Sequence, residues 1–439
     1  MAKVLYVICD GLGDLPLKGK TPLSAARKPN IDALAKGGQC GLLHTIAYGV
    51  IPGSDTAHLA LFGYDPCEYY RGRGTFEALG AGIALKHGDV AFRCNFATVD
   101  ASHRIIDRRA GRLKDFKPLE AAVNEIKLQD CTLKFVSTVE HRGVLVLSAH
   151  SASPSFPSGK GPLSPRRESG QNGAPFSQQE KAGGPGLSSN VSNTDPHEAG
   201  VPIQRCVPLD KSPEAEKTAL LVNEFSRRAL SLLRRHPFNL KLERQKARPA
   251  NALLLRGAAS YVHVESIEKK YGLKAACIAG GALYKGVARY VGMAVPHVPG
   301  ATGRADTDLD AKAKAALSML KSRDLVIVHV KATDSFGHDG DFAGKTRMIE
   351  RVDAMVGALR KGAPDAYILL TGDHSTPVAL KVHSFEPVPV LVNGPLVRVD
   401  TVSRFDELSC AAGSLGHLTG LELFRVVVGL AGKGKLYGN

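Results

Sequence analysis

Three strongly apolar runs are the clearest pattern along the chain. They cover residues 3–10, 324–334 and 366–373 and read KVLYVICD, DLVIVHVKATD and AYILLTGD. Continuous apolar runs of this length are typical of parallel strands that are buried on both faces. Helical patterns lie between and after them, most clearly at 28–38 and 344–362, and both end on glycine. This alternation predicts an α/β fold with a doubly wound sheet that is assembled from both ends of the chain.

The middle of the chain, residues 72–270, has a different pattern. Short strand-like pieces are followed here by one long amphipathic helix, for which Ser212 is the expected N-cap and Pro213 the first helical residue. We therefore predict a second, smaller α/β domain at 72–270, inserted into a first domain that consists of 1–71 and 271–439.

One segment of this middle part, residues 151–186, is rich in Ser, Pro and Gly. Such a segment buries too little apolar surface to offset the entropy that is lost on ordering. We therefore predict that it forms a flexible loop within the inserted domain.

Length and composition favour a globular protein with more than one domain. The 439 residues are 44% hydrophobic and 23% charged, and the formal net charge is +15. The basic residues are widely spread, without a Lys/Arg tail and without the interleaved aromatics that stack on nucleic acid. A small anionic ligand explains this charge at least as well as nucleic acid does, so we expect no nucleic-acid partner.

The cysteine pattern points to a reducing compartment. The eight cysteines form no Cys-x-x-Cys pair and several lie in apolar runs, so we expect buried thiols rather than disulfides or a zinc site. No apolar run approaches the ~18 residues of a membrane span, and the N-terminal pattern is that of a strand rather than a signal peptide. We therefore expect a cytoplasmic protein with no membrane partner, while no sequence feature indicates an oligomeric state.

An aspartate stands at the end of each apolar run: Asp10, Asp334 and Asp373. One such residue is often only a helix N-cap. Ligands of open α/β sheets bind beyond the carboxyl ends of the strands, so we expect the three carboxylates to lie on one rim. Together they would repel one another, and a bound cation is the simplest way to neutralise them.

Three histidines accompany these aspartates. His338 and His374 closely follow Asp334 and Asp373, and His383 precedes another apolar run. Any one of them could be an ordinary surface or core histidine. Mixed carboxylate and imidazole ligands suit Mn, Zn, Co or Fe better than Ca, and there are enough of them here for two metal ions.

The segment PGSDTAHLALFGYDP, residues 52–66, allows more than one interpretation of Ser54. As a helix N-cap, Ser54 would accept a hydrogen bond from an unpaired backbone N–H. As a nucleophile, it would receive a phosphoryl group at the helix N-terminus, with a metal ion to activate its hydroxyl. A Ser-His hydrolase built on Ser54 and His58 is a weaker alternative, because GSDTAH is not a G-x-S-x-G elbow.

Eight motifs, in order along the chain, carry a family resemblance that runs from residue 3 to about residue 430. The chain resembles the cofactor-independent (2,3-bisphosphoglycerate-independent) phosphoglycerate mutases, and their archaeal-type branch most of all. This family belongs to the alkaline phosphatase superfamily, so the resemblance implies an alkaline-phosphatase-like metal-binding domain with an inserted transferase domain. The motifs are VLYVICDGLGD, IPGSDTAHLALFGYDP, GRGTFEALGAGI, IIDRRAGR, NTDPHEAG, LYKGVARYVGM, VHVKATDSFGHDGDFAGK and TGDHSTP.

The resemblance also implies a reaction and its residues. The reaction is the interconversion of 3-phosphoglycerate and 2-phosphoglycerate through a phosphoserine, without bisphosphoglycerate, so phosphoglycerate would be the small-molecule partner. Two divalent metal ions are implied, most often Mn, with Zn, Co or Mg in some members. Ser54 would accept the phosphoryl group, and Lys285 would help to neutralise its charge. The implied metal ligands are Asp10, Ser54, Asp373 and His374 for one ion, and Asp334, His338 and His383 for the other.

The inserted domain would have to hold glycerate while the phosphate is on Ser54. Carboxylate and phosphate groups call for bidentate Arg donors. Proton exchange between the two glycerate hydroxyls needs a general base, for which Asp107 is the candidate. The NTDPH motif at 193–197 could bind substrate or only form a turn. The candidate substrate-binding residues are Arg108, Arg109, Arg112, Arg142 and Arg256.

Two other functions stay open on the sequence. A metal-dependent phosphatase, or another phosphomutase that acts on a sugar phosphate, would use the same ligands. A non-catalytic protein that binds anions or nucleic acid is favoured only by the net charge.

Overall fold

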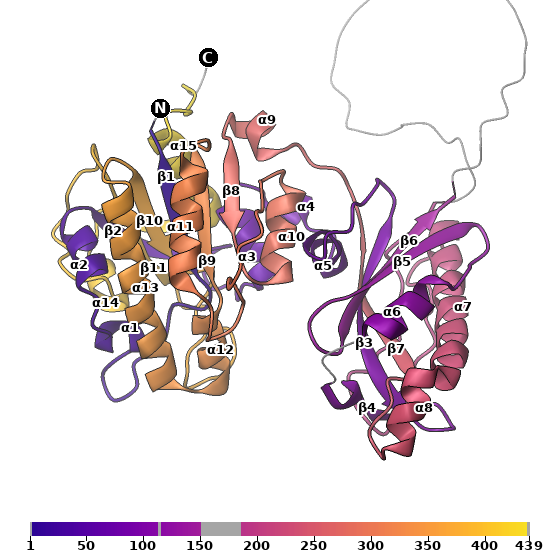
Figure 1. Cartoon of the computed structure of the whole chain (residues 1–439). Coiled ribbons are helices and arrows are strands. Elements are labelled where there is room, and N and C mark those ends of the chain that lie inside the picture. Colours follow the sequence, from indigo (N-terminus) through magenta and orange to yellow (C-terminus); the bar gives the residue numbers. More distant parts are fainter. Residues whose placement is uncertain (1, 113–115, 151–185, 437–439) are drawn as a thin grey trace, which may run out of the picture. The chain divides into compact units, whose positions relative to one another are not determined.

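The computed structural model describes residues 2–112, 116–150 and 186–436, and the side chain of Arg112 is not among the parts described (Figure 1). The flexible loop predicted at 151–186 therefore lies outside the described residues, apart from its last position. No helix among the described residues is both long enough and apolar enough to cross a membrane.

The chain divides into two compact units. Unit 1 comprises Met1–His87 and Tyr261–Asn439, and unit 2 comprises Gly88–Ser260. Unit 2 is one continuous stretch set into unit 1, as in the predicted arrangement, but its ends differ from the predicted ones. Residues 72–87 and 261–270, which we expected in the inserted domain, belong to unit 1.

A close helix contact explains why the chain after residue 71 stays with unit 1. Helix α5 (Arg73–Gly80) packs against α10 (Ala282–Tyr290). A Cβ placed on Gly286 would lie 1.8 Å from the backbone oxygen of Phe76, and one on Gly80 would lie 1.9 Å from that of Ala282. The two helix backbones are therefore in direct contact, which only glycine allows at these positions.

The sheet of unit 1 has seven strands in the order β12-β2-β11-β10-β1-β9-β8. Strands β10, β1, β9 and β8 are parallel, which confirms the three strands predicted from the apolar runs. Strand β11, the apolar run after His383, runs antiparallel to β10 and β2, which the sequence pattern did not predict. The strands are β1 (Val4–Cys9), β2 (Gln39–His44), β8 (Ala275–Ile278), β9 (Leu325–Val330), β10 (Tyr367–Thr371), β11 (Val388–Asn393) and β12 (Gly416–Thr419).

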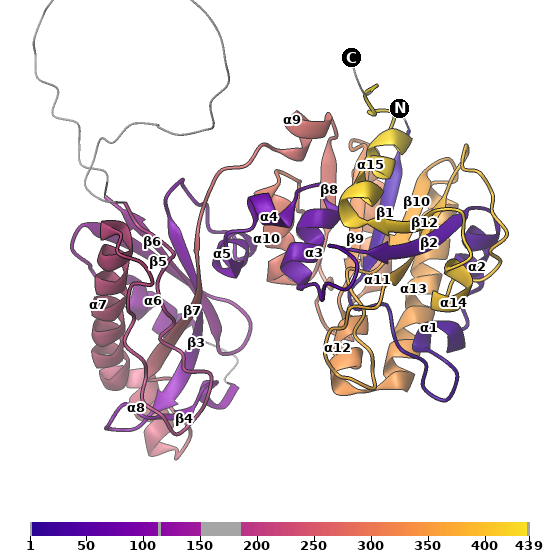
Figure 2. The same ribbon diagram turned by 180° about the vertical axis from the view of Figure 1, so that it is seen from behind.

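Helices cover both faces of this sheet (Figures 1 and 2), and the parallel strands β10, β1, β9 and β8 are buried along their whole length. Alternate residues of β1 enter two separate hydrophobic cores, one on each face, as the continuous apolar pattern requires. One core is shared with α3 (Ser54–Leu61), α4 (Pro66–Tyr69), α5, α9 (Ile267–Tyr271), α10 and α15 (Gly420–Leu430). The other is shared with α1 (Pro22–Ala25), α2 (Pro29–Lys36), α11 (Leu309–Leu320), α12 (Ala332–Asp339), α13 (Phe342–Gly362) and α14 (Glu407–Cys410).

Unit 2 is built on a five-stranded antiparallel sheet with helices packed against one face. In the long helix α7, Ser212 caps the N-terminus and Pro213 is the first residue, as predicted. Apolar side chains of α7 and α6 share one core with alternate residues of β3. The other set of alternate β3 residues includes Arg93 and Asn95, and its Ala97 and Val99 belong to a second, smaller apolar cluster. The elements are β3 (Val90–Val99), β4 (Ile105–Asp107), η1 (Ala110–Arg112), α6 (Lys117–Asn124), β5 (Cys131–Ser137), β6 (Arg142–Ala149), α7 (Pro213–Arg235), α8 (Pro237–Arg244) and β7 (Ala252–Ser260).

The cysteines behave as predicted. All eight are free thiols and all of them lie in the described part of the chain. Seven are buried, and only Cys67 is exposed.

Candidate metal centre

Three aspartates meet at the carboxyl edge of strands β10, β1 and β9. Asp10 directly follows β1, Asp373 follows β10 by two residues, and Asp334 is in the first turn of α12 after β9. Since β1 pairs in parallel with both neighbours, the three residues leave the sheet at the same edge. All three are buried, and Asp10 and Asp373 are fully so.

Asp10, Asp373 and His374 form a first ligand cluster, in which one ligand atom of each lies within 4.8 Å of the others. His374 Nε2 is 3.5 Å from Asp10 Oδ1 and 3.3 Å from Asp373 Oδ2. Ser54 Oγ is 3.1 Å from the same nitrogen. The hydroxyl predicted as a phosphoryl acceptor therefore faces this cluster.

Asp334, His338 and His383 form a second ligand cluster. The Nε2 atoms of His338 and His383 are 3.3 and 3.5 Å from Asp334 Oδ1. Their Nδ1 atoms lie 2.8 and 2.9 Å from the backbone oxygens of Lys381 and Pro52. A carbonyl only accepts, so each Nδ1 carries the proton and each Nε2, when the ring is neutral, presents a lone pair to the cluster, as a metal ligand does.

The side chain of Ser54 does not cap α3. Gly53 occupies the N-cap position without a side-chain bond, and Ser54 is the first helical residue and is buried. The capping interpretation is therefore wrong. His58 Nδ1 donates to the backbone oxygen of Ser54 at 2.6 Å rather than to its hydroxyl, so the Ser54–His58 hydrolase pair does not form.

The donor atoms of the first cluster fit a cation. Asp10 Oδ1 and Asp373 Oδ2 are buried without a hydrogen-bond partner. Burial, reinforced by the negative charge of Asp10, raises the pKa of Asp373 well above its usual range, and burial lowers the pKa of His374 to about 3. Carboxylate oxygens that face a neutral imidazole without a shared proton are a donor set that divalent transition metals bind.

Lys331 is a functional candidate that the sequence reasoning missed. Its Nζ is 2.6 Å from Asp334 Oδ2 and 3.5 Å from Asp10 Oδ2, so it spans the two clusters. Burial alone would lower the pKa of Lys331, but Asp10 and its other neighbours raise it above the usual range, so the side chain is charged. Its position in VHVKATD, directly after β9 and three residues before Asp334, was the available signal.

Lys285, the lysine implied by the family resemblance, lies half-buried in α10. Burial, together with the nearby charge of Arg289, lowers its pKa. The described residues show no hydrogen bond or ion pair between Lys285 and either ligand cluster. Lys331, by contrast, contacts a carboxylate of each candidate ligand cluster.

Two of the predicted arginines in unit 2 converge on Asp195. Arg108 donates through Nε and Nη2 to the two carboxylate oxygens of Asp195 at 3.0 and 2.7 Å, and Arg256 Nε is 3.9 Å from Asp195 Oδ2. Burial would raise the pKa of Asp195, but Arg108 and the backbone N–H of His197 hold it below its usual range. Asp195 and His197 also line a cavity of about 500 Å³. The NTDPH motif thus takes part in a polar site and does not only form a turn.

Asp107, the predicted general base, closes the turn after β4. Its carboxylate accepts hydrogen bonds from the backbone N–H groups of Arg109 and Gly111, each at 2.9 Å, and from Arg248 Nη1 at 2.7 Å. Burial would raise its pKa, but Arg248 and the backbone donors lower it. These contacts hold the carboxylate in its ionised form within the turn.

The remaining predicted arginines do not lie at the Asp195 site in the described part of the chain. Arg109 is exposed in the turn after β4, and Arg142 is exposed at the start of β6. The backbone of Arg112 ends η1, and its side chain lies outside the described part.

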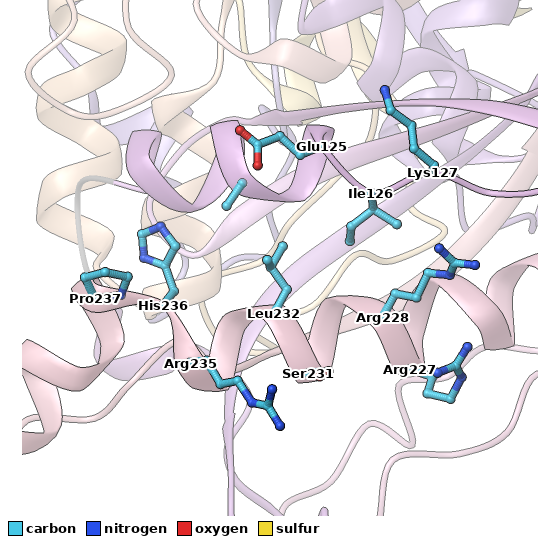
Figure 3. A pocket seen from close by; sticks show the side chains of 11 residues that line it. Glu125, Ile126, Lys127, Arg227, Arg228, Ser231, Leu232, Arg235, His236 and Pro237 are labelled. Carbon is cyan, nitrogen blue, oxygen red and sulfur yellow. The ribbon is translucent and has the colours of Figure 1, made fainter.

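A cavity of about 660 Å³ lies between α6 and α7 of unit 2 (Figure 3). His236, Leu232 and Ile126 line its interior, whereas Arg227 and Arg235 point away from α6 in this view. Its basic side chains therefore do not converge, and none of the predicted site residues lines it.

Comparison with known proteins identifies the family. A family model described as "2,3-bisphosphoglycerate-independent phosphoglycerate mutase" matches residues 35–239. A relative from Archaeoglobus fulgidus, named 2,3-bisphosphoglycerate-independent phosphoglycerate mutase 1, is 44% identical over 441 residues, which cover 99% of each chain. The chain belongs to this mutase family.

A second relative and two solved structures are similar over nearly the whole chain. A Methanocaldococcus jannaschii mutase is 40% identical over 441 residues and 99% of each chain. The solved structure of the PH0037 protein from Pyrococcus horikoshii has a TM-score of 0.79 at 34% identity, covering 100% of this chain and 99% of that one. The cofactor-independent phosphoglycerate mutase from Thermoplasma acidophilum has a TM-score of 0.69 at 32% identity, covering 98% and 100%.

These likenesses confirm several predictions made from the sequence. The chain is a member of a phosphoglycerate mutase enzyme family, and its α/β fold is shared by the two solved structures. The roles of individual residues are a separate matter, and they rest on the geometry described above.

Proposed function

We propose that the chain interconverts 3-phosphoglycerate and 2-phosphoglycerate through a phosphoserine at Ser54, without bisphosphoglycerate. One observation carries the residue-level part of this proposal: the Ser54 hydroxyl is buried beside the first ligand cluster, 3.1 Å from His374 Nε2, and has no capping role. A serine hydroxyl is a weak nucleophile unless a base or a metal activates it, and this position offers such activation. Family membership supplies the substrate class.

Two divalent metal ions, with manganese as the leading candidate and Zn, Co or Mg as alternatives, are part of this proposal. When bound, they would polarise the phosphoryl oxygens and lower the pKa of the serine hydroxyl. The unpartnered carboxylate oxygens and the Nε2 lone pairs support two sites of this kind. The residues that would hold the ions are Asp10, Ser54, Asp373 and His374 for one, and Asp334, His338 and His383 for the other.

The chain's own groups account for the transfer steps. Ser54 Oγ attacks phosphorus as the bond from phosphorus to the C3 oxygen breaks, and the proton that Ser54 loses balances the one that the C3 oxygen takes up to give glycerate. The C2 hydroxyl of the retained glycerate then gives its proton to the general base, and its oxygen attacks the phosphoserine. The bond from phosphorus to Ser54 Oγ breaks and Oγ takes up a proton, which gives 2-phosphoglycerate. The charged Lys331, which contacts carboxylates of both clusters, would offset negative charge on the phosphoryl oxygens. Lys285 has the same proposed role by resemblance alone.

Unit 2 would hold the glycerate carboxylate. We assign this role to Arg108 and Arg256, because guanidinium groups bind carboxylates through paired hydrogen bonds and because these two converge on one buried acid. The other candidate arginines stay proposals from the resemblance. Asp107 is the general base predicted from the sequence. Asp195 is a second candidate because it contacts Arg108 and Arg256 and also lines a cavity.

The two candidate bases can be separated by substitution. D195N and D107N are both close in shape to the native residue, and the base among them should lose about 10²–10⁴-fold in kcat. The other variant should lose stability rather than turnover, which thermal unfolding measures. If both variants retain full kcat, neither aspartate is the base.

A coupled assay of 3- to 2-phosphoglycerate conversion tests the central proposal. The protein is treated with chelator, repleted with Mn²⁺ and assayed without bisphosphoglycerate, and we expect turnover that chelation abolishes. S54A should be inactive, while S322A, which removes an exposed hydroxyl far along the chain, should not change turnover. Phosphate trapped on Ser54 by acid quenching would be found by mass spectrometry. Accumulation of free phosphate instead of 2-phosphoglycerate would favour the phosphatase alternative.

We also propose a cytoplasmic location. Seven buried and free cysteines support a reducing compartment, since an oxidising one would favour disulfides. Fractionation of the source cells tests this, and recovery of the protein in a secreted or membrane fraction would contradict it.

A further inference from the structure

Thr376, which no sequence argument singled out, connects the two ligand clusters. It is fully buried in the loop after β10. Its Oγ1 donates to Asp334 Oδ1 at 2.9 Å and lies 3.0 Å from His374 Nδ1. One hydroxyl therefore touches a ligand of each cluster.

The direction of these two hydrogen bonds follows from proton counting. The hydroxyl of Thr376 has a single proton. Asp334 is paired with the Lys331 ammonium at 2.6 Å, so its carboxylate is an acceptor and takes that proton. The bond between Thr376 and His374 must then be donated by His374 Nδ1–H. This leaves a lone pair on His374 Nε2, the atom that faces Ser54 Oγ and the carboxylates of Asp10 and Asp373.

The three histidines of the centre therefore reach the same tautomer by different means. His338 and His383 donate from Nδ1 to backbone carbonyls, which are acceptors under all conditions. His374 donates to a hydroxyl that can reverse its direction, and only Asp334 prevents the reversal. The tautomer of a first-cluster ligand thus depends on the charge state and position of a second-cluster ligand.

Close packing keeps Thr376 from moving away from this position. Lys345, fully buried in α13, donates from Nζ to the backbone oxygens of Thr376 and Gly13, each at 3.0 Å, and to Asp14 Oδ2 at 2.7 Å. A Cβ on Gly11 would lie 2.6 Å from Thr376 Oγ1. The loop after β1 and the loop after β10 are therefore packed against each other with Thr376 held between them.

We propose that Thr376 is a positioning residue that fixes the His374 tautomer through Asp334 and so couples the two metal sites. This inference rests on the proposed function in one respect, namely that the two clusters bind divalent ions. It adds that the affinity of the first cluster depends on a hydroxyl that is not itself a proposed metal ligand but contacts one ligand of each cluster.

The test compares T376V, which keeps the shape but lacks the hydroxyl, with T376S, which keeps the hydroxyl. Titration of Mn²⁺ into the metal-free full-length protein by calorimetry gives the affinity without any measurement of activity. We expect T376V to bind Mn²⁺ about 10–100-fold more weakly than wild type, the usual loss for an outer partner of a metal ligand. T376S should bind within about threefold of wild type, because the same hydrogen bonds remain available.

Nitrogen NMR of the histidine rings in the metal-free wild type gives a readout that needs no variant. We expect His374 to carry its proton on Nδ1, and H374N identifies its signals. An Nε2–H tautomer would overturn the inference, even if T376V does not fold. Equal Mn²⁺ affinity of folded T376V and wild type would also overturn it. Failure of the wild type to bind Mn²⁺ would instead contradict the proposed two-metal function.

Discussion

At the scale of single residues, the chemistry of this protein depends on where protons and charges are held. His338 and His383 have their Nδ1 protons fixed by backbone carbonyls, so both rings present Nε2 to Asp334. The hydroxyl of Ser54 faces the first cluster and does not cap α3, because Gly53 is the N-cap residue of that helix. The groups that fix these side chains are backbone atoms of the loop after β10 and of the segment just before α3.

The contact of Lys331 with two clusters predicts the effect of its removal. K331M keeps the length of the side chain but removes the charge that spans Asp10 and Asp334. We expect kcat to fall about 10²–10³-fold, as when a preorganised donor to the transition state is lost. K285M is the comparison variant, because Lys285 shows no described contact with the carboxylates of either cluster, and we expect its kcat to fall less than that of K331M. A larger loss in K285M would restore the assignment that came from the family resemblance.

The raised pKa of Asp373 predicts how metal binding responds to pH. Burial and the charge of Asp10 raise the pKa of Asp373, and bonds to Asp334 and Pro52 raise the pKa of His383 against the effect of burial. Raised pKa values mean that the metal-free protein holds more protons at a given pH, and an incoming ion has to displace them. Mn²⁺ affinity should therefore fall as the pH is lowered.

Calorimetry in two buffers of different ionisation enthalpy measures this proton release. Net release of protons near neutral pH is the expected result. If the binding enthalpy is the same in both buffers and the Mn²⁺ affinity does not change from pH 8 to pH 6, the raised pKa values of Asp373 and His383 are contradicted.

At the scale of elements, strand order and helix contacts decide which parts of the sequence meet. Strand β1 lies between β10 and β9 in parallel register, so residues from both ends of the chain reach one edge. Helix α5 belongs to unit 1 because its backbone touches that of α10. The sequence pattern alone assigned α5 to the inserted domain, since a single helix contact has no signature in local hydrophobicity.

This helix contact predicts the effect of a methyl group. G286A would place a Cβ 1.8 Å from the Phe76 oxygen, so α5 would have to move. Overpacking of this kind costs about 1–3 kcal/mol, and we expect a lower midpoint in denaturant unfolding. G429A is the control, because it is also in a helix but meets no atom within 4 Å. It should leave stability unchanged or raise it by up to about 1 kcal/mol through helix propensity. Equal stability of the two variants would show that α5 does not depend on this contact.

At the scale of the whole molecule, the two units carry different groups of polar side chains. Unit 1 carries both ligand clusters and Ser54, and unit 2 carries the arginine cluster around Asp195. Unit 2 is one continuous stretch with its own hydrophobic core, whereas unit 1 needs both ends of the chain to complete its sheet. The two units therefore differ in how far each depends on the other for folding.

This difference predicts that unit 2 folds when it is produced alone. Residues 88–260 should show a cooperative thermal transition by circular dichroism, because their core is internal to the stretch. F225A in the same fragment should lose about 3–5 kcal/mol, since Phe225 is fully buried in that core. A gradual transition that F225A does not shift would contradict an independent core.

The sequence by itself determined the three buried parallel strands, the long helices, the family and the residue types of the two candidate ligand clusters. Asp10, Asp334 and Asp373 could be found because buried parallel strands leave continuous apolar runs, and the residue that follows such a run lies at the ligand-binding edge. The motifs that resemble the phosphoglycerate mutases added Ser54 and the three histidines to the predicted site. All seven lie in the two ligand clusters or beside them.

Only the tertiary structure decided which polar side chains meet within each unit. In unit 1, Lys331 rather than Lys285 contacts carboxylates of the ligand clusters, and Thr376 joins the two clusters. In unit 2, two of the predicted arginines, Arg108 and Arg256, converge on Asp195 rather than on Asp107. The position of a loop depends on contacts with segments far away in the sequence, such as the hydrogen bond from Lys345 to the backbone oxygen of Gly13, 332 positions away. The local pattern of hydrophobic and polar residues reflects burial and periodicity, but it does not show which distant residue a polar atom contacts.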